Sequence, residues 1–492
     1  MTLRIWIVGA LFGAPLLVSG ALAQTPAAAP SSAPPAAAAA PAPATSSSIP
    51  PASLASPPAS SEGLVSPFMP MPLGPAPAAG GDSPPSAASA PSASPTAAPP
   101  AQAAAPPKPR KIVSHRPPRE TALSEDPEPT LQPDTFFATA KASERYSAIV
   151  DAGGWPTDIV AVAPGAKGPA VERLRKRLMI EGYLGPAEAG GRLAWDKALT
   201  AAVKRFQAHM GLRETGIVSG ATLKAINVPA RERFNELASS ANRLAGLNFS
   251  FEDRYVAVNL PSTSVEAVEN GRVVHRYVAI VGGPEHPSPE ISAHIQVINL
   301  NPTWTVPTSI IKNEIIPRMQ RDPGYLTREK IRILDGSGKE INPKSVNWST
   351  ERAANYTLRQ DSGAGNSLGS IRIGMPNKLA VYMHDTPSKG LFGADYRFLS
   401  HGCVRVQGVY DLAAWLLQGT AGPAGGWDKA ALMAKIKEGG AYDIKLAKAA
   451  PVIWVYLTGW SNGDGPANFR NDVYNIDNVG EPQVSAQAAP AR

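Results

Sequence analysis

The chain has 492 residues, a formal net charge of +7 at pH 7 and one cysteine. This length allows two to four domains. A single cysteine excludes an internal disulfide, and the sequence has no basic patch interleaved with aromatic residues, so we expect no nucleic-acid partner.

The first residues, 1–23, have the pattern of a secretory signal peptide. Arg4 gives a positive start, an apolar run from Ile5 to Leu17 follows, and residues 21–23 form a small-residue cleavage pattern. The alternative is an uncleaved membrane anchor, but the apolar run is short for a span and contains two glycines and a proline. We therefore expect an exported protein of the periplasm or cell wall, with no stable membrane span after cleavage.

A segment rich in Pro, Ala and Ser follows, over residues 24–135. It holds 29 of the 51 prolines, all between Pro26 and Pro133, and almost no aromatic residues. Such a composition cannot bury enough apolar surface to offset the entropy of ordering, so we expect a disordered linker. The last residues, 478–492, are expected to be a disordered tail.

Apolar residues at helical spacing indicate a small all-α unit over residues 160–230. Its three stripes are Val171, Leu174, Leu178 and Met179; Leu199, Ala202, Val203 and Phe206; and Thr222, Leu223 and Ile226. The segment VERLRKRLMIEGYL, followed by AVKRFQAHMGLRETGIVSGATLKAI, resembles the peptidoglycan-binding domain family. This resemblance implies binding to the cell wall and names no catalytic residue. A polar connecting helix is expected over 231–252.

From residue 254 the apolar period changes to two, which predicts a mainly β domain over 254–460. The expected strands are Tyr255–Leu260, Val273–Val281, Ile295–Leu300, Ile371–Ile373, Leu379–Met383 and Val452–Thr458. The expected helices are Ser309–Met319, Val409–Leu417 and Lys429–Lys437. The fold class is therefore multidomain: a small all-α domain followed by a mainly β domain with a few helices.

Two short sequence motifs of the predicted β domain contain the candidate catalytic residues. One is HDTP, which begins at His384 after a predicted strand, and the other is SHGCVR, from Ser400 to Arg405. A thiol is nucleophilic as its thiolate and needs a base or a positive neighbour, which His384 or His401 could supply for Cys403. Gly402 permits the unusual dihedrals of an exposed nucleophile on a turn, whose N–H groups could face an oxyanion.

Two interpretations in which Cys403 is not a nucleophile remain open at this point. The cysteine count alone fits a buried, inert thiol as well as a reactive one. Cys403, His401 and His384 could in principle bind zinc, but the His-Gly-Cys spacing is tight for two ligands of one ion, so we expect no metal. A buried inert thiol does not explain the glycine and the two histidines.

These phrases resemble the signature of the L,D-transpeptidase family, in which a histidine precedes a Ser/Thr-His-Gly-Cys-x-Arg/Asn motif. Here His384 precedes Cys403 by 19 positions, and SHGCVR is intact. NLNPTWTVP, from Asn299 to Pro307, and the segment Ser367–Phe392 are similar to the larger members that cross-link the wall. In those members an insertion, here 308–366, forms a lid over the site.

The resemblance implies a role for each residue of the signature. Cys403 is the nucleophile and His384 is its base, while Asp385 orients the imidazole, in the family usually through its backbone carbonyl. His401, Gly402 and Cys403 shape the oxyanion site. The residues expected to contact substrate are Arg405, Ser400, Tyr382 and Trp304. Tyr382 and Trp304 fit equally well as ordinary buried aromatics.

The implied reaction is a two-step acyl transfer without a metal or an organic cofactor. Cys403 displaces the terminal D-alanine of a tetrapeptide stem, and the side-chain amine of diaminopimelate on a neighbouring stem attacks the thioester, giving a 3→3 cross-link. The implied partners are peptidoglycan stem peptides and glycan. Two alternatives stay open: an L,D-carboxypeptidase-like hydrolase, in which water is the acceptor, and a catalytically inert wall-binding protein.

Overall fold

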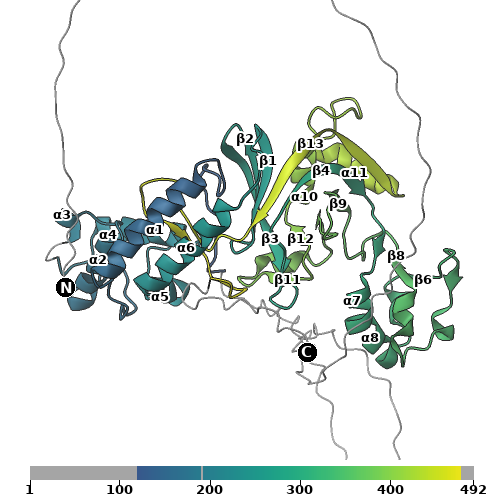
Figure 1. The fold of residues 1–492 in the computed structure, drawn as a ribbon, viewed down its shortest axis with the longest axis horizontal. Coiled ribbons are helices and arrows are strands. Elements are labelled where there is room, and N and C mark those ends of the chain that lie inside the picture. Colours follow the sequence, from purple (N-terminus) through teal and green to yellow (C-terminus); the bar gives the residue numbers. More distant parts are fainter. Residues whose placement is uncertain (1–118, 190–191, 478–492) are drawn as a thin grey trace, which may run out of the picture. The chain divides into compact units, whose positions relative to one another are not determined.

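A computed structural model of the chain describes residues 119–189 and 192–477 (Figure 1). The predicted signal peptide, 1–23, and the predicted tail, 478–492, lie outside the described residues, as does most of the predicted linker. Within the ranges that are described, no helix is both long enough and apolar enough to cross a membrane.

The described residues between Thr135 and Ala245 form helices joined by loops. They are α1 (Thr135–Asp151), α2 (Pro169–Ile180), α3 (Pro186–Ala189), α4 (Lys197–His209), α5 (Gly220–Ile226) and α6 (Ala230–Ala245). Helix α4 begins where Asp196 accepts a hydrogen bond from the N–H of Leu199, at 2.8 Å, which satisfies one free donor of the first turn. The predicted stripes face one core, in which these residues are fully buried: Val171, Leu174, Leu178, Leu199, Ala202, Val203, Phe206 and Ile226.

The segment before helix α1 differs from the prediction. The predicted disordered linker, 24–135, is too long at its C-terminal end, because residues 119–134 are bonded to the β domain. The N–H of Thr121 donates to Asp395 (2.8 Å), and the N–H of Thr130 donates to the buried carboxylate of Glu266 (2.8 Å). Helix α1 then packs against α6. Residues 119–134 therefore contact the β domain, and the helix that follows them contacts the helical part of the chain.

The β domain is built on one large sheet. Its strands are β1 (Arg254–Asn259), β2 (Ser264–Glu269), β3 (Arg272–Gly282), β4 (Ile291–Leu300), β9 (Ile371–Gly374), β10 (Met383–His384), β11 (Phe398–Ser400), β12 (Val404–Val406) and β13 (Tyr442–Val455). Their order is β11-β3-β12-β10-β9-β4-β13-β1-β2. Because β2 pairs with β3 as well as with β1, the sheet closes on itself. The short strands β10 and β12 are neighbours and lie between β3 and β9.

Helices α10 (Val409–Leu416) and α11 (Lys429–Glu438) complete the core of this sheet. Leu412 of α10 and Leu432 of α11 are fully buried, in one cluster with Met383 of β10 and Val404 of β12. Burying such a side chain contributes on the order of 2 kcal/mol. The packing on this side therefore fixes β10, which carries His384, and β12, which directly follows Cys403.

Most of the predicted elements of the β domain are present. Four predicted strands coincide closely with β1, β3, β4 and β9, and the predicted strand Val452–Thr458 overlaps the end of the longer β13. The predicted helices Val409–Leu417 and Lys429–Lys437 correspond to α10 and α11. The predicted helix Ser309–Met319 is a succession of α7 (Thr308–Ile310), the π-helix η1 (Ile311–Ile315) and α8 (Ile316–Arg321).

The predicted strand Leu379–Met383 is wrong, because only Met383 lies in a strand. The side chain of Asn377 bonds the backbone groups that a neighbouring strand would have bonded. Its Oδ1 accepts from the N–H of Leu379 (3.0 Å) and of Val381 (3.3 Å), and Ala380 has a left-handed φ of 54°. The segment is therefore a turn that leads into β10.

The insertion forms a small sheet with its own core. The sheet has the order β5-β8-β6-β7, from β5 (Trp304–Thr305), β8 (Thr357–Gln360), β6 (Ile331–Leu334) and β7 (Glu340–Ile341). Helices α7, η1, α8 and α9 (Tyr325–Arg328) and the 3-10 turns η2 (Pro343–Ser345) and η3 (Glu351–Asn355) complete it. Its buried cluster includes Ile311, Met319, Leu326, Ile333 and Leu358.

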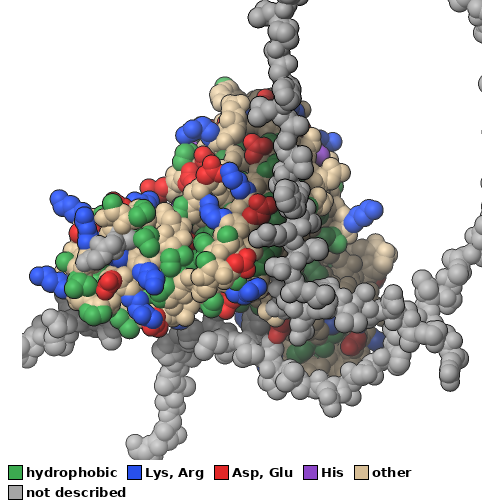
Figure 2. Space-filling model, turned by 60° about the vertical axis from the view of Figure 1, so that its left-hand side comes forward, with side chains coloured by type: hydrophobic (Ala, Val, Ile, Leu, Met, Phe, Trp, Pro, Cys, Tyr) green, Lys and Arg blue, Asp and Glu red, His purple; other side chains and the backbone are tan. Residues whose placement is uncertain are grey.

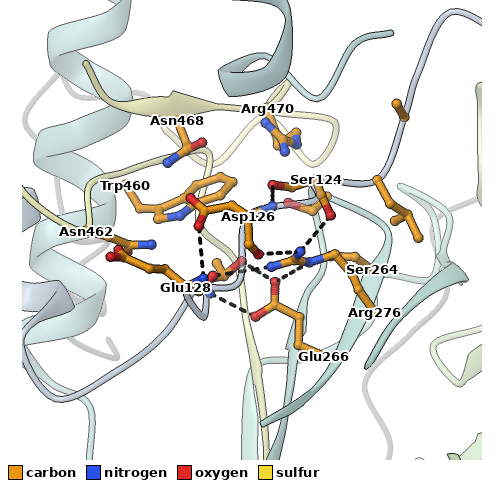
Figure 3. Close-up of a pocket in the computed structure, with 14 residues that line it drawn as sticks. Ser124, Asp126, Glu128, Ser264, Glu266, Arg276, Trp460, Asn462, Asn468 and Arg470 are labelled. Atoms are coloured by element: carbon orange, nitrogen blue, oxygen red, sulfur yellow. Dashed lines mark hydrogen bonds and ion pairs between the residues drawn. The ribbon is translucent and has the colours of Figure 1, made fainter. Parts of the chain in front are cut away.

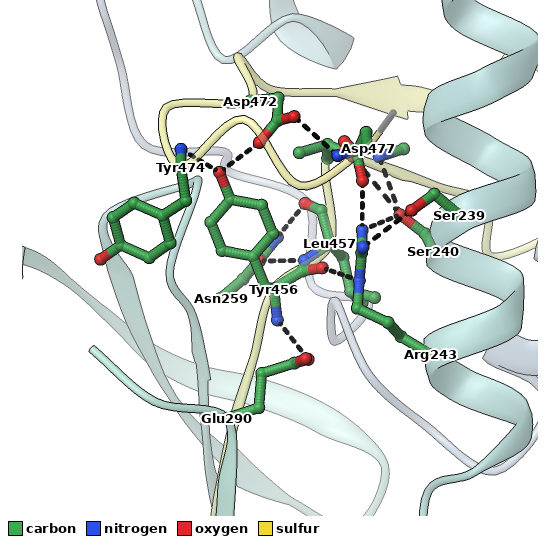
Figure 4. A network of polar contacts seen from close by, with 12 residues as sticks. Ser239, Ser240, Arg243, Asn259, Glu290, Tyr456, Leu457, Asp472, Tyr474 and Asp477 are labelled. Carbon is green, nitrogen blue, oxygen red and sulfur yellow. Dashed lines mark hydrogen bonds and ion pairs between the residues drawn. The ribbon is translucent and has the colours of Figure 1, made fainter. Parts of the chain in front are cut away.

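The segment after β13 returns to the helices and contains β14 (Gly459–Trp460) and β15 (Asn468–Phe469). A polar network holds it there (Figure 4). Arg243 of α6 pairs with Asp477 at 2.7 Å and donates to the carbonyl of Tyr456 at 2.8 Å, and the Tyr456 hydroxyl donates to Asp472 at 2.7 Å. The network links helix α6 to the end of strand β13.

Candidate active site

The register of β10 and β12 brings four predicted residues to one face of the sheet. The two strands are parallel, with Met383 opposite Val404 and His384 opposite Arg405. Parallel partners point to the same face, and so do residues two apart in one strand. His384 and Arg405 therefore share a face, which we call the active face. Tyr382, directly before β10, lies on it with its ring centroid 5.7 Å from that of His384, and Cys403, directly before β12, lies beside Tyr382. Met383 and Val404 point into the apolar core on the other side.

Arg372 belongs to the active face too, and the sequence did not single it out. It lies opposite His384 in the antiparallel pair of β9 and β10, and its guanidinium lies 5.3 Å from the ring centroid of Tyr382. Its Nε donates to Asn299 of the next strand at 2.9 Å. The only sequence signal for it is a charged residue alternating with isoleucines in a short strand.

His384 is buried and oriented by a backbone carbonyl. Its Nδ1 lies 2.5 Å from the carbonyl oxygen of Asp385, which can only accept, so Nδ1 carries the proton and Nε2 keeps a free lone pair. Burial, together with the positive charge of Arg405, lowers the pKa of His384 to about 3. The imidazole is therefore neutral at physiological pH and can accept a proton at Nε2.

The carboxylate of Asp385 does not touch the imidazole. It accepts the N–H of Ser370 at 3.0 Å and pairs with Lys389, in the 3-10 turn η4 (Lys389–Gly393). Asp385 therefore orients His384 through its carbonyl, while its side chain fixes the turn before β9. Gly369 in that turn has a φ of 61°, and a Cβ there would lie 2.4 Å from Oδ2 of Asp385.

Cys403 is a free, half-buried thiol beside Tyr382. Burial raises the pKa of the Cys403 thiol, and Tyr382 and the charges of Arg405 and Arg372 oppose that shift in part. The resting thiol is therefore protonated at neutral pH. Burial also raises the pKa of Tyr382, so the phenol stays neutral, and Trp304 of β5 lies near it.

Two hydrogen bonds from serine hydroxyls to backbone carbonyls hold the turn from Ser400 to Cys403. The Ser400 hydroxyl donates to the carbonyl of Cys403 at 2.5 Å, and the hydroxyl of Ser288 donates to the carbonyl of Gly402 at 2.7 Å. Gly402 has a φ of 103°, a conformation that side chains rarely adopt. Ser400, expected to contact substrate, is buried and lies in the support of this turn.

His401 points to the insertion. Its Nε2 lies 2.8 Å from Oε1 of Glu314 in η1, and its ring stacks on His286, with centroids 4.7 Å apart. Neither Glu314 nor His286 was singled out in the sequence, because both are far from the motif along the chain. The structure thus places the two histidines of the signature differently, His384 on the active face and His401 against the insertion.

Arg405 carries a donor that the protein leaves unused. In the described part of the chain its Nε is buried without a hydrogen-bond partner, and burial lowers the pKa of its guanidinium. A buried donor of this kind is costly unless a ligand satisfies it. Within 119–189 and 192–477, no three His, Cys, Asp or Glu side chains are grouped to hold a metal ion.

The fold and the site together indicate a candidate thiol enzyme with a helical accessory domain. Comparison with known families identifies the class of each domain. Residues 253–424 match the family model of the L,D-transpeptidase catalytic domain, and residues 167–226 match that of the putative peptidoglycan binding domain. The chain thus carries a catalytic domain of the L,D-transpeptidase family, preceded by a peptidoglycan-binding domain.

Parts of the chain are also similar to individual proteins. A putative L,D-transpeptidase of Haemophilus influenzae is 30% identical over 223 residues, which are 45% of this chain and 44% of the relative. The chain thus matches less than half the length of this curated relative. Among solved structures, the L,D-transpeptidase of Xylanimonas cellulosilytica is 18% identical, with 60% of this chain and 97% of that one covered and a TM-score of 0.20. That of Stackebrandtia nassauensis is 14% identical, with coverages of 62% and 97% and a TM-score of 0.23.

Proposed function

We propose that this protein is an L,D-transpeptidase that forms 3→3 cross-links in peptidoglycan through a thioester on Cys403. The observation that carries the proposal is the active face, where the thiol of Cys403 and the neutral imidazole of His384 lie among two guanidinium groups. This is the set of groups that acyl transfer by a thiol requires: nucleophile, base and positive charge for an anionic peptide.

In the first step, the Cys403 sulfur attacks the carbonyl carbon that precedes the terminal D-alanine of the donor stem. The thiol proton passes to Nε2 of His384 as the carbon–sulfur bond forms. The carbon–nitrogen bond to D-alanine then breaks, and the imidazolium returns the proton to the leaving amine. A thioester and free D-alanine result. The resting pair is neutral, so proton transfer and attack occur together.

In the second step, the amine of diaminopimelate on an acceptor stem attacks the thioester. Nε2 of His384 takes a proton from the attacking amine, the new amide forms, and the proton returns to the departing sulfur. The thiol is regenerated, so no cofactor is consumed. Water in place of the amine would give a hydrolase by the same steps.

The N–H of Cys403 supports stabilisation of the oxyanion. In the described residues it donates to no other group, whereas the N–H of Gly402 already donates to Ser400 at 3.3 Å. A free backbone donor at the nucleophile is the common arrangement for stabilising a tetrahedral oxyanion. Arg405 and Arg372 would bind a carboxylate of the donor stem, with Tyr382 and Trp304 beside it.

The peptidoglycan-binding domain and the predicted export signal support a location in the periplasm or at the cell wall. On the face shown in Figure 2, Lys and Arg side chains are interspersed with Asp and Glu and do not form a patch of one sign. A polymer of sugar and peptide suits such a surface better than a partner bound by charge alone.

Product analysis tests the proposal. The full chain is incubated with a disaccharide tetrapeptide that serves as donor and acceptor, and the products are separated and sequenced by tandem mass spectrometry. We expect a dimer linked between two diaminopimelate residues, absent with Cys403→Ala. Tripeptide without dimer would show that the protein is a hydrolase instead. Binding to sacculi without turnover by the wild type would show an inert wall-binding protein.

A further inference from the structure

A cavity of about 390 Å³ lies between the peptidoglycan-binding helices and the β domain. Met210 after α4 and Val228 after α5 line it from one side, and Phe398 of β11 and Val473 of the returning segment line it from the other. None of the side chains of the active face lines it. Its volume lies in the range of pockets that hold small ligands, and its walls are largely apolar.

Arg470 lines this cavity with donors that no protein group accepts. Its Nη1 donates to the carbonyls of His209 (2.8 Å) and Phe469 (2.6 Å), while Nε and Nη2 make no hydrogen bond within the described residues. Figure 3 shows Arg470 without a contact to the carboxylate of Glu266 in the adjoining pocket. Gly211 leaves room for the guanidinium, because a Cβ there would lie 2.6 Å from its carbon.

Arg397 is a second cation at this cavity and is buried. Its guanidinium donates to the hydroxyls of Thr263 (2.6 Å) and Thr121 (3.1 Å) and to the carbonyl of Ala394 (2.7 Å). All of these acceptors are neutral. Burial lowers the pKa of both Arg397 and Arg470 to about 10, which reflects the weak compensation of their charges.

The acidic residues at the rim are already engaged. Asp395 accepts the N–H groups of Glu120 (3.1 Å) and Thr121 (2.8 Å), and Glu120 accepts the N–H of Ala221 (3.0 Å). Lys224 adds a further positive charge to the lining. Buried guanidinium groups are normally paired with a carboxylate or phosphate, because an unpaired buried charge is costly. Within the described residues, no carboxylate forms an ion pair with Arg397, which is buried, or with Arg470, which is half-buried and whose guanidinium lies 5.0 Å from the ring centroid of Trp460.

We propose that this cavity binds the carboxylate end of a peptide with small apolar side chains. The free N–H groups of Arg470 would bind the carboxylate, since a guanidinium fork matches its two oxygens. The apolar walls would hold methyl-sized side chains. The ligand identity rests on the proposed function, because wall stems end in alanine. The site would hold a second stem at the junction of the wall-binding and catalytic domains.

The test uses the full wild-type chain with labelled methyl groups and needs no turnover. The probe is N-acetyl-D-alanyl-D-alanine, compared with its C-terminal amide. We expect the free acid to shift the methyl resonances of Met210 and Val473 in a saturable way, and the amide to have no effect. Arg470→Gln should weaken binding about tenfold or more, because it removes hydrogen bonds to a charged group. Lys224→Gln should weaken it less.

Arg272→Gln is the matched control, since Arg272 is exposed in β3 and does not line the cavity. It should bind the acid as the wild type does. Lys224 is also exposed, so its variant keeps the test valid if Arg470→Gln fails to fold. Equal binding of acid and amide, unchanged binding in both variants, or displacement by equimolar inorganic phosphate would overturn the proposal. Loss of turnover in Cys403→Ala with intact binding here would test the proposed function separately.

Discussion

The imidazole of His384 and the thiol of Cys403 form a neutral resting pair. The pKa of His384 is lowered to about 3, so the imidazole stays uncharged above that pH, and burial raises the pKa of Cys403, so the thiolate is scarce at neutral pH. We expect alkylation of Cys403 by iodoacetamide to be slow at pH 5–7 and to rise steadily towards alkaline pH. The rate is followed by mass spectrometry across the pH range.

A thiolate–imidazolium pair would give the opposite profile. Alkylation would then be fast from acidic pH, with a plateau that begins at the low pKa of the thiol and ends at the raised pKa of the histidine. Such a plateau would contradict the neutral pair. Denatured protein provides the reference, because its only thiol titrates near the ordinary value.

His384 and His401 should respond differently to substitution. His384→Ala removes the base and should lower kcat/KM by about 10²–10⁴-fold. His401 contacts Glu314 of the insertion, so His401→Ala should resemble Glu314→Gln, and the double variant should lose less than the sum of the two. Steady-state kinetics on all four variants measures this. Additive losses in the double variant would show that the contact between His401 and Glu314 has no functional part.

At the scale of elements, the turn before β9 fixes the base indirectly. Gly369 has a left-handed φ, and any Cβ there would collide with Asp385, whose carbonyl orients His384. Gly369→Ala should lower the free energy of unfolding by about 1–3 kcal/mol, from strain and overpacking, and should also reduce activity. Urea denaturation measures the first effect.

Gly336→Ala is the comparison for Gly369→Ala. Nothing lies within 4 Å of a Cβ at Gly336, and its φ is not left-handed. We expect this variant to stay within about 0.5 kcal/mol of the wild type. Equal stability of the two alanine variants would show that the contact with Asp385 can relax without cost.

The sequence predicted the elements that alternate clearly and missed those fixed by side chains elsewhere. Strands β1, β3 and β4 follow the apolar period of two. The turn at Leu379 depends on the side chain of Asn377, which no periodicity reveals. Helix α1 was missed because its buried face carries Thr135, Thr139 and Ala142 beside a single aromatic residue. Its stability comes from packing on α6, so local propensity gives little signal.

The site was predictable only where residues of one motif lie together. SHGC and the preceding histidine identified Cys403 and His384, and the structure brings both to the active face. Arg372, Glu314 and His286 reach the same region from other elements, so only the strand order and the fold of the insertion reveal them.

At the scale of the whole molecule, the network in Figure 4 joins helix α6 to the segment after β13. Arg243 and Asp477 form a largely buried pair, with 17% and 6% of their side chains exposed. Arg243→Ala leaves a buried carboxylate and a carbonyl without their donor, and should cost about 3–5 kcal/mol of stability. The double variant Arg243→Met with Asp477→Leu should cost less, because no charge is left unpaired. Urea denaturation of both variants measures these losses of stability. An equal loss in the two variants would contradict this account.

The central claim is a covalent bond between the donor peptide and Cys403, and the intact mass of the enzyme tests it most directly. The full chain is mixed with a tetrapeptide donor whose diaminopimelate side-chain amine is blocked by acetylation, so that no acceptor is present, then quenched in acid and weighed. We predict an increase equal to the donor minus its terminal alanine, located on Cys403 by peptide mapping and discharged by an added acceptor amine as the 3→3 product. Undiminished cross-linking by Cys403→Ala, or turnover with no adduct on Cys403 under any quench, would contradict the account.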